Sequence, residues 1–257
     1  MRHLVYLFAL TIISNLSFSQ KTKREYYELK VYHYKDSIQE KILDNYFSQA
    51  YIPAIHKVGI RTVGVFKAIA NDTAAEKVLY VLTPFKSLDE FTSTDKKLNS
   101  DKDYLQNGSA YLDAAYNKAP YTRTESILLY AFELAPKLTA SGLQSPKSER
   151  LYELRSYESP TEKLYGNKVK MFNQGGEIDI FSRLGFNSVF YGEVIAGSHM
   201  PNLMYLTTYD NRKSRDEHWK AFSDDPSVKK LFAMEEYKNN VSKAEIIFLR
   251  PTVYSEL

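Results

Sequence analysis

Two short segments place charged and hydroxyl groups where they could bind a ligand. Each carries an acid, a base and a tyrosine on alternate residues: Glu28, Lys30 and Tyr32 in the first, and Glu153, Arg155 and Tyr157 in the second. In a strand, alternate residues share one face. The acid–base pairs could therefore clamp a polar ligand or a carboxylate. Alternatively, the pairs neutralise each other across an interface between the two halves, and the amphipathic tyrosine rings fill that interface.

Histidines give no metal-binding pattern. His33, His56, His199 and His218 are the histidines beyond the leader, and none has a partner at metal-ligand spacing. We therefore expect no metal and no cofactor. If the chain is an enzyme, His33, His218 and Tyr157 are the candidate acid–base groups. The sequence lacks Gly-x-Ser-x-Gly, a phosphate-binding glycine loop and His-Glu-x-x-His.

Composition excludes several classes of protein. With 44% hydrophobic and 25% charged residues, the chain matches a soluble globular protein. Its net charge is +3 and its basic residues are scattered, so we expect no nucleic-acid partner. It has no cysteine, which excludes disulfides, thiolate metal sites and a cysteine nucleophile.

The N-terminus has the pattern of an export signal. Arg2 precedes the apolar run 4–13, and small residues follow up to Ser19. This predicts a signal peptide over residues 1–19, cleaved before Gln20. The run is short for a transmembrane helix. We therefore expect a periplasmic or secreted protein with no membrane span after cleavage, the alternatives being an uncleaved anchor or a buried strand.

The chain repeats itself. Residues 27–32 (YELKVY) return as 152–157 (YELRSY). Further matches keep their order along each half: Phe47 with Phe172, Gly59 with Gly185, Tyr80 with Tyr205, and Ser87 with Ser214. A repeat of this length indicates duplicated domains rather than a solenoid.

Each half predicts the order βαββαβ. In the first half, alternation and caps predict strands near 24–34, 60–70, 76–84 and 124–134, with helices beginning at Asp36 and Ser87. The second half opens with a strand from 149 and predicts further strands near 186–196, 202–210 and 243–250, with helices beginning at Ser159 and Ser214. This is the ferredoxin-like pattern. We expect an α+β protein with domains over 20–134 and 149–257, joined by a linker over 135–148.

The ferredoxin-like arrangement leaves one sheet face bare, because both helices cover the other face. We expect Leu29, Val31 and Leu154 beneath the helices. The polar and aromatic set would then line the open face, where the halves meet as an intramolecular pseudo-dimer. This face would hold the predicted ligand-binding residues Glu28, Tyr32, Glu153, Arg155 and Tyr157. The sixth candidate, Trp219, lies early in the last predicted helix.

The second half resembles the NIPSNAP family of the dimeric α/β-barrel superfamily. The resemblance rests on 152–157, Phe172, Gly185-Phe186, the run 219–222 (WKAF) and Asp225-Pro226. The first half resembles it more weakly, since Lys30 replaces Arg155 and Trp219 has no clear counterpart. The resemblance implies an α/β-barrel pseudo-dimer and a cavity bordered by helix starts, which adds His218 and Trp219 as candidates. It implies no agreed reaction or catalytic set.

Three functions follow as hypotheses. The first is an exported protein that binds a small apolar or aromatic molecule in the barrel cavity. The second, by analogy with related folds, is a cofactor-independent oxygenase or isomerase. The third is a structural or assembly module whose partner is a further copy of the same chain.

Overall fold

Eight strands form in the described part of the chain, and apolar and polar residues alternate along several of them. In the computed structural model, which describes residues 22–257, they are β1 (Tyr26–Tyr34), β2 (Gly64–Ala68), β3 (Lys77–Phe85), β4 (Arg123–Ala131), β5 (Leu151–Glu158), β6 (Asn187–Ala196), β7 (Asn202–Tyr209) and β8 (Lys243–Pro251). The predicted signal peptide over 1–19 and its cleavage before Gln20 lie outside the described residues.

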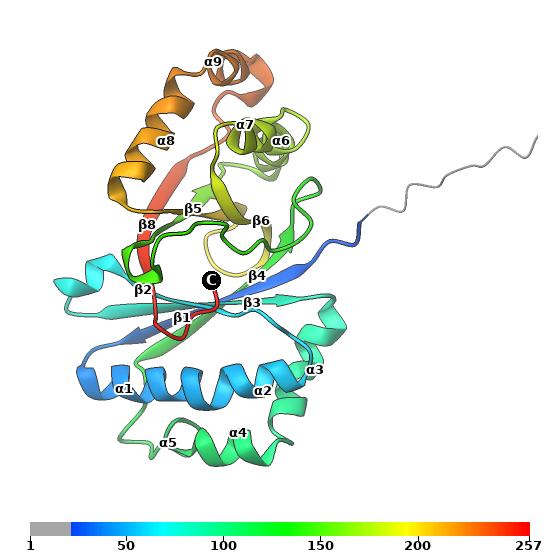
Figure 1. Cartoon of the computed structure of the whole chain (residues 1–257). Helices are drawn as coiled ribbons and strands as arrows, with labels where there is room; N and C mark the ends of the chain where they lie inside the picture. The colour runs from blue at the N-terminus through cyan, green and yellow to red at the C-terminus, as the bar shows by residue number, and fades with distance from the viewer. Residues whose placement is uncertain (1–21) are drawn as a thin grey trace, which may run out of the picture.

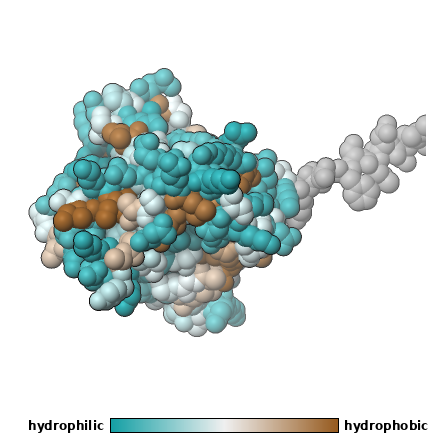
Figure 2. Space-filling model, turned by 90° about the horizontal axis from the view of Figure 1, so that it is seen from below, coloured by the Kyte–Doolittle hydropathy of each residue, from teal (hydrophilic) through white to brown (hydrophobic). Residues whose placement is uncertain are grey.

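The helices of the two halves cover opposite sides of the strands (Figure 1). On one side lie α1 (Ser37–Asn45), the π-helix η1 (Tyr46–Tyr51), α2 (Ile52–Lys57), α3 (Leu88–Leu98), α4 (Lys102–Asn107) and α5 (Ser109–Leu112). On the other lie α6 (Glu162–Phe172), α7 (Glu177–Arg183), α8 (Arg212–Asp224) and α9 (Pro226–Ala233). Single 3₁₀ turns are η2 (Ile69–Asp72), η3 (Lys147–Glu149) and η4 (Glu235–Tyr237). Seen from the side of α1, α4 and α5, the surface is mainly hydrophilic, with apolar side chains gathered in a few patches (Figure 2).

The strands of both halves join into one closed barrel. Its order is β1-β3-β2-β8-β5-β7-β6-β4, so each half contributes four neighbouring strands in the ferredoxin-like arrangement. The halves meet edge to edge through antiparallel β2–β8 and β4–β6 pairs. This confirms the predicted α+β fold of two related halves, and closure removes every free sheet edge.

The prediction of which strand face lies beneath the helices is wrong. Leu29, Val31 and Leu154 point into the barrel, together with Tyr27 and Tyr152. Two ring pairs join the halves inside it: Tyr27 with Phe190, at a centroid distance of 5.3 Å, and Tyr152 with Phe66, at 4.8 Å. The physical reason is closure, because the bare faces of the two sheets together form an interior that only the apolar set can fill.

Two predicted helix starts are also wrong. Thr161, not Ser159, caps α6, since its hydroxyl accepts the Leu164 N–H at 3.2 Å. Asn211, not Ser214, caps α8, since its side-chain oxygen accepts the Ser214 N–H at 2.9 Å. The cap of α6 therefore lies two residues later than predicted and that of α8 three residues earlier, and each accepts a free amide of the first helical turn.

The corrected cap changes how the halves align. Asn211 is the counterpart of Ser87, which caps α3. Sheet register agrees, because Lys30 pairs with Val81 as Arg155 pairs with Tyr205. The match of Tyr80 with Tyr205 is therefore wrong: Tyr80 faces the barrel, whereas Tyr205 faces the helices.

In each half, the segment that follows the last strand lies along a strand of the other half. The C-terminal segment 252–257 lies along β2: the Thr252 N–H donates to the Val65 carbonyl at 2.9 Å, and the Val65 N–H donates to the Ser255 hydroxyl at 3.0 Å. Leu257 then enters the barrel core and is only 2% exposed. Reciprocally, the segment after β4 lies along β6, where the Thr139 N–H donates to the Val189 carbonyl at 2.9 Å.

We predict that Leu257→Ala lowers the free energy of unfolding by about 2–5 kcal/mol, because it removes a buried leucine from the barrel core. Val253→Ala is the matched control, since Val253 is 96% exposed in the same segment. Urea unfolding measures both variants. Equal effects of the two substitutions would contradict the placement of the C-terminus in the core.

Candidate functional site

A buried carboxylate is the centre of a polar network in the second half. Glu153 on β5 is fully buried and accepts from three side chains. Its Oε1 accepts from Arg155 Nε at 2.5 Å and from Arg215 Nη2 at 3.2 Å. Its Oε2 accepts from Arg215 Nε at 2.6 Å and from Trp219 Nε1 at 3.1 Å. Both Arg215 and Trp219 come from α8, so the network ties this helix to the sheet.

Aromatic rings fill the remaining space beside this carboxylate. The Arg155 guanidinium lies 3.6 Å from the centroid of the Trp219 ring, in cation–π geometry. Arg155 also donates from Nη1 to the Tyr157 hydroxyl at 2.9 Å, and that hydroxyl lies 2.9 Å from the hydroxyl of Tyr205. The side chains at the second-half site thus satisfy one another's polar groups.

The predicted site residues divide into separate places. Glu153, Arg155, Tyr157 and Trp219 meet, but on the helix side of β5 and within one half, not across the seam between the halves. Glu28, Lys30 and Tyr32 occupy the corresponding side of β1 in the first half.

The two candidate histidines lie elsewhere. His33 stands at one end of the barrel, with ring nitrogens 3.1 Å from Glu125 and 3.4 Å from Glu76. His218 on α8 has its Nδ1 2.7 Å from the Ser214 carbonyl, and its ring packs against that of Phe186, at 5.4 Å between centroids. The structure thus brings neither histidine together with the charged pairs.

Sequence reasoning missed a second buried ion pair, Lys168 with Glu177. Their charged atoms lie 2.8 Å apart, and both side chains are at most 5% exposed. Lys168 Nζ also lies 4.5 Å from the ring centroid of Phe172. A lysine on α6 facing a glutamate across the Gly175-Gly176 break has no signal in sequence spacing, because the break sets the geometry.

The corresponding place in the first half is a pocket of about 210 Å³. It lies between β1, β3 and the helices, and its charged lining residues are half-buried or exposed, whereas its aromatic ones are buried or half-buried. The lining residues are Glu28, Lys30, Tyr32, Tyr46, Phe47, Tyr51, Val81, Thr83, Asp95, Leu98, Asn99, Tyr104, Tyr111 and Leu112.

The pocket is open because the filling residues of the second half are replaced. Asp95 and Trp219 stand the same number of residues after their caps, as do Phe91 and Arg215. Asp95 is short and exposed, so it leaves the volume that the indole fills in the other half. Phe91 turns to the ring of Phe85, at 5.3 Å between centroids, and provides no guanidinium.

Hydroxyl groups in the wall are bonded in pairs. The pairs are Tyr46 with Tyr104 at 2.8 Å, Tyr111 with Tyr32 at 3.3 Å, and Tyr51 with Thr83 at 3.1 Å. Each pair uses one hydroxyl hydrogen, which leaves the second as a donor for another acceptor. Burial raises the pKa of Tyr32 and Tyr46 well above the usual value for a phenol. These hydroxyls are therefore neutral donors and acceptors at physiological pH.

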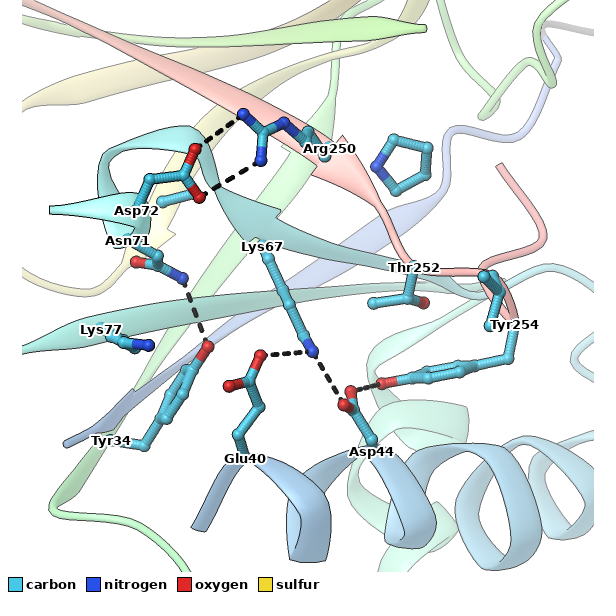
Figure 3. Close-up of a pocket in the computed structure, with 13 residues that line it drawn as sticks. Tyr34, Glu40, Asp44, Lys67, Asn71, Asp72, Lys77, Arg250, Thr252 and Tyr254 are labelled. Atoms are coloured by element: carbon cyan, nitrogen blue, oxygen red, sulfur yellow. Dashed lines mark hydrogen bonds and ion pairs between the residues drawn. The ribbon is translucent and has the colours of Figure 1, made fainter. Parts of the chain in front are cut away.

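A larger cleft of about 530 Å³ lies at the seam where β8 and the C-terminal segment meet β2 and α1 (Figure 3). Its charges neutralise one another. Lys67 lies 2.7 Å from both Glu40 and Asp44, and Arg250 binds both carboxylate oxygens of Asp72. This cleft is therefore a weaker candidate than the tyrosine-lined pocket.

Residues 22–257 contain neither a membrane-crossing helix nor a metal-binding cluster of side chains. None of their helices is long and apolar enough to cross a membrane. Within that same stretch, histidine, aspartate and glutamate side chains form no group of three or more that could hold a metal ion.

We predict that Glu153→Gln lowers the free energy of unfolding by about 3–5 kcal/mol, because two guanidinium groups lose a buried counter-charge. Glu28→Gln is the matched control at the same strand position. Its carboxylate is half-buried and is bonded by the Ser126 hydroxyl at 2.7 Å, so we expect a loss below about 1 kcal/mol. Urea unfolding measures the free energy of unfolding of both variants. Similar losses in the two variants would contradict the asymmetry of the two halves.

Comparison with solved structures places the whole fold. A proposed monooxygenase from Lactobacillus acidophilus NCFM matches at a TM-score of 0.58 and 11% identity, over 89% of this chain and 94% of that one. A proposed monooxygenase from Fusobacterium nucleatum subsp. nucleatum matches at 0.57 and 8%, over 90% and 93%. An anthrone oxidase-like protein matches at 0.50 and 7%, over 90% and 93%. At these identities the likeness shows the fold alone.

Sequence comparison adds the family. No curated protein matches the chain. The family model described as NIPSNAP matches residues 152–256, the half that holds Glu153, Arg155 and Trp219. Residues 152–256 are therefore similar to the NIPSNAP family, and they make up most of the second half of the closed barrel.

Proposed function

We propose that this protein binds one small molecule per chain, in the tyrosine-lined pocket of the first half. One observation carries the proposal: the same place is open in the first half, whereas Trp219 and Arg155 fill it in the second. Duplication supplied both halves with a similar framework, and the substitution of Asp95 for Trp219 leaves space in only one of them.

The size and lining of the pocket limit its ligand. Its volume of about 210 Å³ equals that of roughly seven water molecules. Drug-sized ligands usually occupy about 300–1,000 Å³. Phenol hydroxyls and carboxylates line it beside aromatic rings, so a ligand with polar groups fits better than a purely apolar one. The expected barrel cavity is the less suitable place, because apolar side chains pack the barrel interior.

A cofactor-independent oxygenase is the second candidate. It is supported by the description of two structurally similar proteins as proposed monooxygenases. Oxygen consumption in the presence of a bound ligand tests it. Oxygen consumption that the Asp95→Trp substitution abolishes would favour the oxygenase. If the wild-type protein consumes no oxygen, binding remains the supported function.

We predict that Asp95→Trp abolishes ligand binding, because it introduces the side chain that fills the second half. Asp89→Trp is the matched control on the exposed side of the same helix, outside the pocket lining. A fragment library is screened by ligand-observed NMR, and hits are titrated by calorimetry. We expect hits that bind wild type and Asp89→Trp at one site per chain and fail to bind Asp95→Trp.

Two results would overturn the proposal. One is a wild-type protein that binds no fragment. The other is a set of hits that bind Asp95→Trp as tightly as wild type, since those fragments would occupy another place. Circular dichroism and the melting temperature of each variant confirm that it is folded.

A further inference from the structure

We propose that the ligand of the first-half pocket is a small organic cation, an amine or a quaternary ammonium compound. This inference rests on the proposed binding function and names the chemical class of the ligand. It is drawn from the charges, the rings and the carboxylate contacts of the pocket.

Substitutions between the halves reverse the charge of the site. The second half holds one carboxylate, Glu153, and two guanidinium groups, those of Arg155 and Arg215. The first half keeps the carboxylate as Glu28 and adds Asp95, while Lys30 is its one cationic lining residue. An excess of positive charge becomes an excess of negative charge at the same place in the fold.

The carboxylate of Glu28 lacks the partners of its counterpart. Glu153 accepts four hydrogen bonds, three of them from guanidinium groups. Glu28 accepts from the Ser126 hydroxyl, and no guanidinium of the described chain reaches it. A half-buried carboxylate gains most from a cation that enters beside it, because burial weakens its hydration.

Aromatic rings beside the carboxylates suit a cation. Tyr32, Tyr46, Tyr51, Tyr104 and Tyr111 all line the pocket. The face of an aromatic ring attracts cations within about 6 Å of its centroid, and quaternary ammonium groups are recognised in this way.

The electrostatics of the wall agree with this class of ligand. Lys30 Nζ already lies 5.8 Å from the centroid of Tyr32, so the wall accommodates an ammonium group at its edge. Burial raises the pKa of Tyr51, and the charges of Glu28 and Asp95 raise it further. The negative field of the two carboxylates therefore reaches the tyrosines, and it favours a cation in the space between them.

Three probes of nearly equal shape test the charge. Choline is the cation, 3,3-dimethylbutan-1-ol is its neutral carbon counterpart, and 3,3-dimethylbutanoate is an anion. Each is titrated by calorimetry into the full chain at low salt and neutral pH. We expect choline to bind at least about tenfold more tightly than the neutral alcohol, equivalent to about 1.4 kcal/mol, and the anion not to bind.

Variants assign the effect to the pocket. Glu28→Gln is expected to weaken choline binding about tenfold, and Lys30→Met to strengthen it by removing a competing ammonium group. Asp89→Asn is the control, an exposed acid on α3 outside the pocket lining, and should leave the affinity unchanged. Equal losses in Glu28→Gln and Asp89→Asn would show general surface attraction and overturn the inference.

The outcomes separate this inference from the proposed function. If the alcohol or the anion binds as tightly as choline, the ligand class is wrong and the binding pocket stands. The same holds if no probe binds while other fragments bind in a manner that Asp95→Trp abolishes. If neither probes nor fragments bind, both proposals fail.

Discussion

Closure of the barrel is the constraint on which the rest of the structure depends. Once β2 pairs with β8 and β4 with β6, one face of every strand lies toward the barrel interior, while helices cover the outer faces of β1 and β5 and leave much of β4 and β8 exposed. An apolar interior then forces the charged positions of β1 and β5 to the helix side, where burial makes a lone charge costly. In the second half, Arg155, Arg215 and Trp219 donate hydrogen bonds to Glu153 and stabilise its buried charge, and this network holds α8 against the sheet. In the first half Lys30, Phe91 and Asp95 replace these three residues, and a pocket lies in their place.

Much of the fold could be predicted from sequence. The repeat shows that the two halves share one order of elements, and capping and turn residues mark where each element begins and ends. Gly59 and Gly185 adopt positive φ at the ends of their helices, where glycine is favoured. The direction of the strand faces could not be predicted in the same way. Alternation separates Leu29 and Val31 from Glu28 and Lys30, but it does not tell which set lies inside when both faces become buried. That depends on edge pairing between residues far apart in the chain.

The candidate site was predictable only in part. The spacing of Glu153 and Arg155 predicted a pair on one strand face, and the NIPSNAP resemblance added Trp219. Arg215 was missed because a cap at Ser214 displaces α8 by three residues, whereas the cap at Asn211 gives its true start. Tyr104 and Tyr111 were missed because α4 and α5 are short helices with little periodicity. Correct alignment of the caps would have revealed that Asp95 replaces Trp219.

The central claim is that one half keeps an open site that the other half has filled. Fluorine NMR of protein labelled with 3-fluorotyrosine tests it most directly, during titration with a fragment that binds. We predict that the resonances of Tyr46, Tyr104 and Tyr111 shift with saturation, while those of Tyr157 and Tyr205 do not. Shifts confined to Tyr157 and Tyr205, or equal shifts in both groups, would contradict the account.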